Sequence, residues 1–227
     1  MEILKKEKKR IWCPGCGMFA IEKIVSEEMN KMGWDRTNTV VVSGIGCSAR
    51  IAEYFNVDSL HTTHGRTIPV AEGIKLANEK INVVIISGDG DLLSIGGNHL
   101  LHALQRNLNI KVFCNNNRVY AMTGGQTSAT TPKGEKTKTD PEGREIQALD
   151  VELLFEKRND VFFARTNTLD VENFKKTTEK SLKFKGFSFV EIVSPCVANI
   201  ERKLKTRDFV KVMEEFKKEK DSFKYSD

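Results

Sequence analysis

The alternation of two kinds of apolar segment is the feature that most constrains the fold of this chain. Continuous apolar runs, typical of strands buried on both faces of a sheet, occupy residues 39–42, 83–86, 110–114, 161–163 and 187–193. Apolar side chains at three- and four-residue spacing, typical of amphipathic helices, occupy residues 21–32, 71–78, 99–108 and 171–182. Strands that alternate with helices predict an α/β fold, with a mostly parallel sheet and helices on both of its faces.

The segment 123–149 breaks this alternation. It is rich in Gly, Thr, Lys and Pro, has no apolar periodicity and is longer than an ordinary connection. We therefore expect an active-site loop there. The rest of the chain shows no internal repeat and no linker, so we predict a single domain over residues 1–227.

Composition and charge exclude several classes of protein. Hydrophobic residues make up 39% and charged residues 30% of the chain, as in ordinary globular proteins. The net charge is +5, but Lys and Glu are interleaved, for example in residues 211–220, which predicts a solvated surface and no nucleic-acid partner. No apolar run approaches the roughly 20 residues that span a bilayer, and no apolar segment of a secretory signal follows the basic start. We expect a cytoplasmic protein without membrane contact, in which the cysteines stay reduced.

Small and polar residues follow three successive predicted strands. These loops read SGIGCSA at 43–49, SGDGD at 87–91 and NNNRVYAMTGGQ at 115–126. Because parallel strands end at one edge of a sheet, the loops should converge and present backbone N–H groups to a phosphate. The first loop also fits the dinucleotide pattern G-x-G-x-x-A. The acidic residue that this pattern needs behind the next strand is missing, since Asp58 comes too early, so a nicotinamide or flavin site is disfavoured.

The second and third loops together predict a magnesium diphosphate site. Asp89 lies between two glycines, and Asn117 follows the next strand, 28 positions later. A carboxylate, an amide oxygen and a backbone carbonyl are the hard ligands that Mg²⁺ takes when it bridges a diphosphate. Either loop alone would more often be a solvated turn. As a pair behind two apolar strands, they match the thiamine diphosphate motif.

Four cysteines form a second constellation. Cys13 and Cys16 have the CxxC spacing, and Cys47 and Cys196 each follow a predicted strand. A thioredoxin-like dithiol is disfavoured because the basic segment before Cys13 offers no strand. Four thiolates suit either zinc or a 4Fe–4S cluster, and a neighbouring thiamine site, which needs an electron acceptor, favours iron. Cys114 lies inside an apolar run and is predicted to be a buried structural thiol.

Five segments, in order, resemble the β subunit of 2-oxoacid:ferredoxin oxidoreductases. They are WCPGCG at 12–17, SGIGCS at 43–48, HTTHGR at 61–66, GDGD at 88–91 and NRVYAMTGGQ at 117–126. The similarity continues through GFSFVEIVSPC at 186–196. The segment MTGGQTSATTPKG, 122–134, is most similar to the 2-oxoglutarate branch of that family.

The resemblance implies the thiamine diphosphate-binding fold and assigns roles to individual residues. Mg²⁺ would be held by Asp89, Asn117 and the Val119 carbonyl, and the cluster by Cys13, Cys16, Cys47 and Cys196. The thiamine diphosphate contacts would be Ile45, Gly46, Cys47, Ser48, His64, Gly90, Asp91, Ala121 and Met122. His64 would lie near the reactive carbon or the diphosphate, and Arg50 near the substrate carboxylate. The simpler alternatives are that His64 caps the helix that begins near Arg66 and that Arg50 is a surface residue.

The resemblance also implies a reaction and partners. The family oxidises a 2-oxoacid with coenzyme A, here 2-oxoglutarate to succinyl-CoA and CO₂, and passes electrons through the cluster to ferredoxin. In the family an α subunit supplies the glutamate for the aminopyrimidine, and the resemblance implies such a partner here, with γ and δ subunits as possible further partners. Glu53 and Glu72 lie near the right loops but are interpreted as exposed helix residues. VANIERKL at 197–204 departs from the family, and Gly124 and Gly125 stand where broad-specificity relatives carry a lysine.

The alternatives that remain open belong to different classes. They are a pyruvate or branched-chain 2-oxoacid oxidoreductase β subunit, a non-catalytic iron–sulfur or zinc scaffold subunit, and a thiamine decarboxylase or synthase without redox chemistry.

Overall fold

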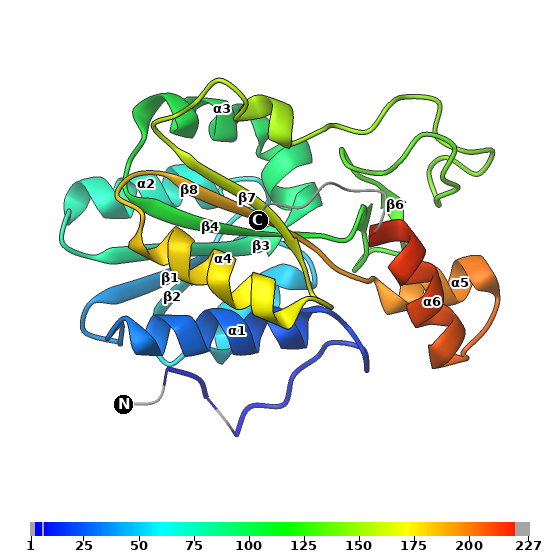
Figure 1. Cartoon of the computed structure of the whole chain (residues 1–227), viewed down its shortest axis with the longest axis horizontal. Coiled ribbons are helices and arrows are strands. Elements are labelled where there is room, and N and C mark those ends of the chain that lie inside the picture. Colours follow the sequence, from blue (N-terminus) through cyan, green and yellow to red (C-terminus); the bar gives the residue numbers. More distant parts are fainter. Residues whose placement is uncertain (1–2, 6, 221–227) are drawn as a thin grey trace.

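Six parallel strands form the central sheet of the protein (Figure 1). The structure is a computed structural model, which describes residues 3–5 and 7–220. The strand order is β2-β1-β3-β4-β8-β7. The strands are β1 (Thr39–Ser43), β2 (Asp58–His61), β3 (Asn82–Gly88), β4 (Ile110–Asn116), β7 (Phe162–Asn167) and β8 (Ser188–Val193). Because every pairing is parallel, all six strands end at the same edge of the sheet.

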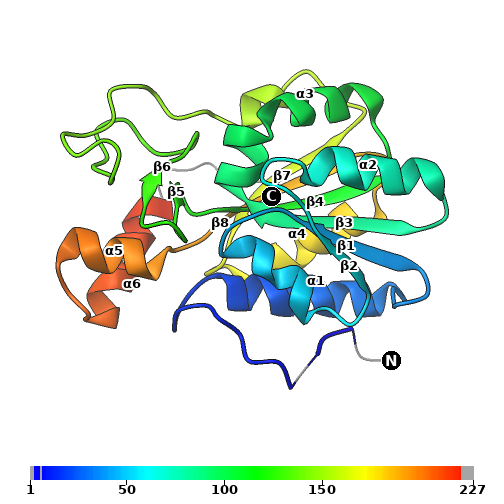
Figure 2. The ribbon, with the colours of Figure 1, turned by 180° about the vertical axis from the view of Figure 1, so that it is seen from behind.

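Helices cover both faces of this sheet (Figures 1 and 2). One face carries α1 (Met18–Lys31) and α4 (Val171–Lys183), and the other carries α2 (Thr67–Ala77) and α3 (Gly97–Arg106). The predicted α/β architecture is therefore confirmed. Among the helices of the described chain, none has the length and hydropathy needed to cross a membrane.

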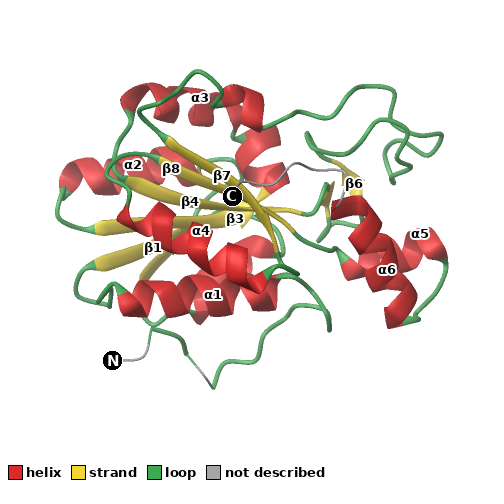
Figure 3. Cartoon of the chain, viewed as in Figure 1, coloured by secondary structure: helices red, strands yellow, loops and turns green. Residues whose placement is uncertain are grey.

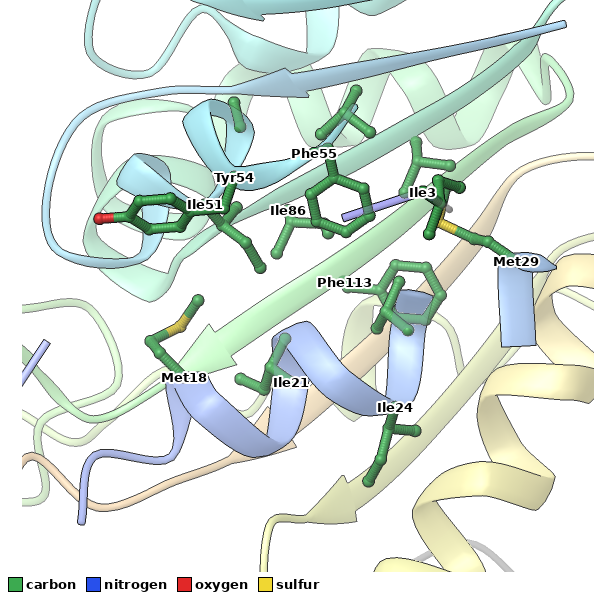
Figure 4. Packing of buried hydrophobic residues seen from close by; sticks show 14 of the residues in the cluster. Ile3, Met18, Ile21, Ile24, Met29, Ile51, Tyr54, Phe55, Ile86 and Phe113 are labelled. Atoms are coloured by element: carbon green, nitrogen blue, oxygen red, sulfur yellow. The ribbon is translucent and has the colours of Figure 1, made fainter. Parts of the chain in front are cut away.

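The strands supply apolar side chains to both faces because successive residues point in opposite directions. Ile86 and Phe113 face α1, where Figure 4 shows them packed near Ile21 and Ile24. Their strand neighbours face α2 and α3; Ile85 is one of them. This two-sided burial is why the strands are continuous apolar runs in the sequence.

Short elements complete the carboxyl edge of the sheet. A 3₁₀ helix, η1 (Ser48–Tyr54), follows β1, and a π-helix, η2 (Gly90–Ile95), follows β3. The expected loop at 123–149 is mostly irregular, but it includes β6 (Gln126–Thr127), which pairs with β5 (Val119–Tyr120). A second 3₁₀ turn, η3 (Glu152–Leu154), leads toward β7.

The C-terminal segment forms two helices (Figure 3), whose charged side chains are mostly exposed as expected but which also have a buried apolar face. α5 (Val197–Leu204) and α6 (Phe209–Lys220) form a helical pair beyond the end of β8. Val212 and Phe216, four residues apart, are buried against residues of β8 and α5. The charged side chains of 211–220 therefore cover only one side of an amphipathic helix, because Val212 and Phe216 share its inner face.

Candidate cofactor pocket and thiol cluster

The three predicted loops converge at the carboxyl edge and enclose a pocket of about 280 Å³. The loop after β1, the π-helix after β3 and the segment after β4 supply most of its walls. The predicted cofactor and magnesium residues all lie in its lining: Ile45, Gly46, Cys47, Ser48, His64, Asp89, Gly90, Asp91, Asn117, Val119, Ala121 and Met122. Convergence follows from the parallel sheet, because the strand ends cannot separate.

Asp89 is a buried carboxylate at the base of this pocket. Its side chain accepts a hydrogen bond from Thr130 Oγ1 at 2.9 Å, and burial raises the pKa of Asp89 to about 6. Burial raises the pKa because it disfavours the anion, and a nearby cation would reverse that effect. Asn117 faces the same pocket, and its Oδ1 accepts from the Val119 N–H at 3.2 Å. This donor set fits an oxygen-coordinated cation.

Asp91 organises a second part of the pocket wall. Its Oδ1 accepts from the Gly65 N–H at 2.7 Å and the Ile45 N–H at 3.2 Å, and it lies 2.6 Å from His64 Nδ1. Because two backbone donors already point at Oδ1, that oxygen is an acceptor and His64 Nδ1 is the donor. The remaining nitrogen, Nε2, belongs to a ring that lines the pocket. His64 therefore does not cap α2, which begins without a side-chain cap.

Two glycines allow these walls to approach closely. A β-carbon at Gly90 would lie 2.5 Å from the Tyr120 ring, whose hydroxyl donates to the Gly90 carbonyl at 3.2 Å. A β-carbon at Gly44 would collide with the Asp91 carboxylate. Both positions therefore require glycine, because any side chain would displace a wall of the pocket.

A buried polar chain links the pocket to the end of β8. Asn115 Nδ2 donates to Ser48 Oγ at 2.7 Å, and Ser194 Oγ donates to Asn115 Oδ1. All three side chains are buried, so their hydrogen bonds specify how the loops after β1, β4 and β8 lie relative to one another.

The loops that carry the four predicted cluster cysteines meet beside this chain. Trp12 Nε1 donates to the Cys47 carbonyl at 2.7 Å, which ties the CxxC segment to the loop after β1. A β-carbon at Gly17 would lie 2.5 Å from Ser194 Cβ, so the same segment also contacts the loop before Cys196. Contacts therefore bring together three segments that are far apart in the sequence.

The thiols themselves are close enough to influence one another. Burial, and then the charges of Cys16, Cys47 and Cys13, raise the pKa of Cys196 to about 12. Burial likewise raises the pKa of Cys16 to about 11, with Cys47 and Cys13 adding to the effect. Four mutually repelling thiolates would be stabilised by a cationic centre between them. In the described residues, no three or more His, Cys, Asp or Glu side chains form an arrangement that could hold a metal ion.

Cys114 is separate from this group. It is fully buried in the core beneath α2 and α3, and burial raises its pKa well above the ordinary value. The prediction that Cys114 is a buried structural thiol is confirmed.

Three residues that the sequence analysis considered lie outside the pocket lining: Arg50, Glu53 and Glu72. Arg50 is absent from the pocket lining, and its Nη2 pairs with Glu53 Oε1 at 2.5 Å. Glu72 was expected to be exposed, but this was wrong: it is 5% exposed and accepts two bonds from Arg106, at 2.8 and 2.5 Å. Glu53 is half-buried rather than exposed, because it pairs with both Arg50 and Lys8.

Sequence reasoning missed several residues of the site. Tyr120 and Thr123 line the pocket, and Thr130 bonds to Asp89 from within the long loop. Tyr120 belongs to the NRVYAMT segment and could have been included with its neighbours. Thr130 carried no signal, because a threonine in an irregular loop has no periodicity to show which side is buried.

Comparison with known proteins identifies the family. Residues 44–192 match the thiamine pyrophosphate enzyme, C-terminal TPP binding domain. The 2-oxoglutarate synthase subunit KorB of Methanothermobacter thermautotrophicus is 42% identical over 214 residues, which cover 94% of this chain and 75% of that protein. The 2-oxoglutarate oxidoreductase subunit KorB of Mycobacterium tuberculosis is 38% identical over 185 residues, covering 82% and 50% respectively.

A solved structure agrees with these relatives. The 2-oxoglutarate:ferredoxin oxidoreductase from Magnetococcus marinus, with 2-oxoglutarate, coenzyme A and succinyl-CoA bound, superimposes with a TM-score of 0.81 at 33% identity. The match covers 85% of this chain and 66% of that one. The chain therefore belongs to the β-subunit family of 2-oxoacid:ferredoxin oxidoreductases, in its 2-oxoglutarate branch.

Proposed function

We propose that this chain is the catalytic β subunit of an enzyme that oxidises 2-oxoglutarate with coenzyme A to succinyl-CoA and CO₂. Electrons would leave through a 4Fe–4S cluster to ferredoxin. The observation that carries the proposal is the position of Cys47, which lines the cofactor pocket and also belongs to the thiol group. One loop therefore borders both the proposed site of decarboxylation and the proposed electron acceptor.

The residues that would hold the cofactors are the ones that the sequence predicts. Asp89, Asn117 and the Val119 carbonyl would hold Mg²⁺, and Cys13, Cys16, Cys47 and Cys196 would hold the cluster. When bound, thiamine diphosphate would supply the carbanion that attacks the keto carbon, and the cluster would supply a one-electron acceptor.

The chain's own groups would orient the reactants and move protons. Asp91 keeps His64 Nδ1 in a donor role at 2.6 Å, so Nε2 can exchange a proton with a group in the pocket. The Gly90–Tyr120 contact closes one wall against water. Free thiols at all five cysteines fit a reducing compartment, and we propose a cytoplasmic location.

A second subunit is needed to complete this pocket. Among the described residues that line it, none is Glu, Lys or Arg. The pocket thus lacks both a glutamate for the aminopyrimidine and a cation for the carboxylates of 2-oxoglutarate. Three of its lining side chains, Ile45, Ile95 and Met122, are apolar and 41%, 44% and 46% exposed. These features support an α subunit that covers the pocket and supplies the missing charges.

The test is a reconstitution with a matched pair of variants. The chain is purified anaerobically with its α subunit and assayed for viologen reduction that depends on 2-oxoglutarate and coenzyme A. We expect turnover with 2-oxoglutarate at a higher kcat/KM than with pyruvate, and little turnover by the β chain alone. Asp89→Ala should abolish thiamine diphosphate binding in calorimetry, whereas Asp58→Ala, on the exposed edge strand β2, should not change it.

The outcomes separate the alternatives. Cofactor binding without turnover would indicate a scaffold subunit. Faster oxidation of pyruvate would refute the choice of substrate, and unchanged cofactor binding by Asp89→Ala would refute the proposed magnesium site.

A further inference from the structure

A buried polar network connects strands β7 and β8 to the base of the cofactor pocket. Arg165 on β7 and Glu191 on β8 are paired in register, and Arg165 Nε donates to Glu191 Oε2 at 2.7 Å. Glu191 Oε1 accepts at 2.6 Å from Nδ2 of Asn116, the last residue of β4. Thr130 Oγ1 lies 2.8 Å from Asn116 Oδ1 and 2.9 Å from Asp89 Oδ2. We call Arg165, Glu191, Asn116 and Thr130 the Arg165 network, and every member is buried.

The ion pair fixes the direction of these hydrogen bonds. A carboxylate only accepts, so Glu191 faces the amide nitrogen of Asn116, and the amide oxygen must face the other way. That oxygen accepts from the Arg118 N–H at 3.2 Å. The Thr130 hydroxyl has one proton and two neighbouring acceptors. Because the Asn116 oxygen already has the Arg118 donor, the Thr130 proton is available to the Asp89 carboxylate.

The same network supports an unusual backbone turn. Arg118 has a φ of 64°, in the left-handed region that residues other than glycine seldom adopt. Its N–H is held by Asn116, and its carbonyl accepts from the Thr131 hydroxyl. Arg118 lies between Asn117 and Val119, the two predicted magnesium ligands of this segment. The conformation of Arg118 therefore sets how the Asn117 side chain and the Val119 carbonyl are placed relative to each other.

We propose that Asn116 and Thr130 are positioning residues for a divalent cation and its diphosphate. Thr130 orients the Asp89 carboxylate, and Asn116 holds the turn that carries the other two oxygen ligands. Neither side chain is part of the pocket lining, so both act through the ligands and not by touching the cofactor. The inference rests on the proposed function, which assigns the cation to this site. Partners that orient metal ligands typically contribute about tenfold to hundredfold to metal affinity.

The experiment compares three threonine variants in the complete αβ complex, after a chelator has removed divalent cations. Thr130→Val removes the hydroxyl and nearly keeps the shape of the side chain, whereas Thr130→Ser keeps the hydroxyl. Thr178→Val is the control, because Thr178 is equally buried but donates to the Phe174 carbonyl at 2.8 Å within α4. Mn²⁺ is the probe, and its binding is followed by electron paramagnetic resonance with thiamine diphosphate present. Thermal unfolding measures the stability of each complex.

We expect Thr130→Val to raise the dissociation constant of Mn²⁺ about tenfold and Thr130→Ser to leave it near the parent value. Asn116→Ala, which removes the acceptor of the Arg118 N–H, should raise it to a similar extent. Thr178→Val should lower the unfolding temperature without changing Mn²⁺ binding. At saturating Mg²⁺, calorimetry should show equal thiamine diphosphate affinity in Thr130→Val and the parent, because only the cation ligands are disturbed. A purely structural role would weaken cofactor binding at every Mg²⁺ concentration.

Three results would overturn the positioning role. They are parent-like Mn²⁺ binding by Thr130→Val, an equal loss of binding in Thr130→Ser, and an equal loss in Thr178→Val. The proposed function would survive each of them if the parent complex binds thiamine diphosphate and oxidises 2-oxoglutarate. Its own failure would appear in the parent, as absence of thiamine diphosphate binding that depends on a divalent cation.

Discussion

Asp91 offers the sharpest test of how the pocket wall is held together. The side chain is 2% exposed and accepts from five donors: two backbone N–H groups, the hydroxyls of Ser87 and Thr67, and His64. Asp91→Ala removes every acceptor at once, whereas Asp91→Asn keeps the shape and one oxygen. The two substitutions therefore separate the loss of the hydrogen bonds from the loss of the charge.

The two substitutions should lower the free energy of unfolding by different amounts. In Asp91→Asn the amide oxygen can stay at the Oδ1 position and accept from the backbone donors, while the amide nitrogen faces the Ser87 and Thr67 hydroxyls, which can turn to accept. Only the charge is lost, at a cost of about 1–2 kcal/mol. In Asp91→Ala the buried Gly65 N–H and the part-buried Ile45 N–H lose their acceptor, at about 1–3 kcal/mol each, and a cavity remains. We expect a total of about 5 kcal/mol.

Urea unfolding at pH 7, followed by tryptophan fluorescence, measures both values. In thermal unfolding, the same costs correspond to shifts of about 3–6 °C and about 15 °C for a chain of this length. Asp58→Ala on exposed β2 is the control and should change stability by less than about 0.5 kcal/mol. Equal destabilisation by Asn and Ala would show that charge, rather than hydrogen-bond acceptance, holds the wall, and would refute this reasoning.

Two further predictions concern the thiols and the core. Cys196→Ser should lower the bound iron of the reconstituted protein. Cys114→Ser should leave it unchanged, because that thiol is buried away from the other four. The reverse pattern in an iron assay would contradict the assignment. Burial lowers the pKa of Lys111 to about 7. Between pH 7 and the ordinary pKa of a lysine, the unfolded chain therefore binds more protons than the folded chain. The free energy of unfolding should rise over this pH range, by on the order of 4 kcal/mol. Urea titrations at pH 7 and 10 should show this rise in the parent protein and a smaller rise in Lys111→Met. An equal rise in both proteins would contradict a buried, neutral lysine.

The fold and the pocket could be predicted because their signals are local. Five of the six strands contain the apolar runs that the sequence shows, and the pocket loops directly follow three of them. β2 was missed because its four residues are all exposed and carry little apolar pattern. As an edge strand it is set by pairing with β1, which sequence periodicity does not record.

Other features depend on contacts between distant segments. Glu72 looked like an exposed helix residue because its partner, Arg106, comes 34 positions later on α3. The inner face of α6 escaped notice because only Val212 and Phe216 are buried among many charges. The pairing of Arg50 with Glu53 was not foreseen either, although both residues belong to the 3₁₀ turn η1, and the role of Arg50 toward the substrate stays a prediction. For Glu72 and for the inner face of α6, the residues that decide the burial lie in other elements of the chain.

The arrangement of the carboxyl edge explains why one chain can hold both a cofactor pocket and a group of thiols. The loop after β1 contributes Ser48 to the pocket and Cys47 to both sites, so the two sites cannot move independently. The chain from Ser48 through Asn115 to Ser194 extends this coupling to the loop that carries Cys196. Because these bonds are buried and join three strand ends, a displacement of any one loop would change the separation between pocket and thiols. In the proposed function, electron transfer would depend on that separation, and the buried polar chain would keep it constant.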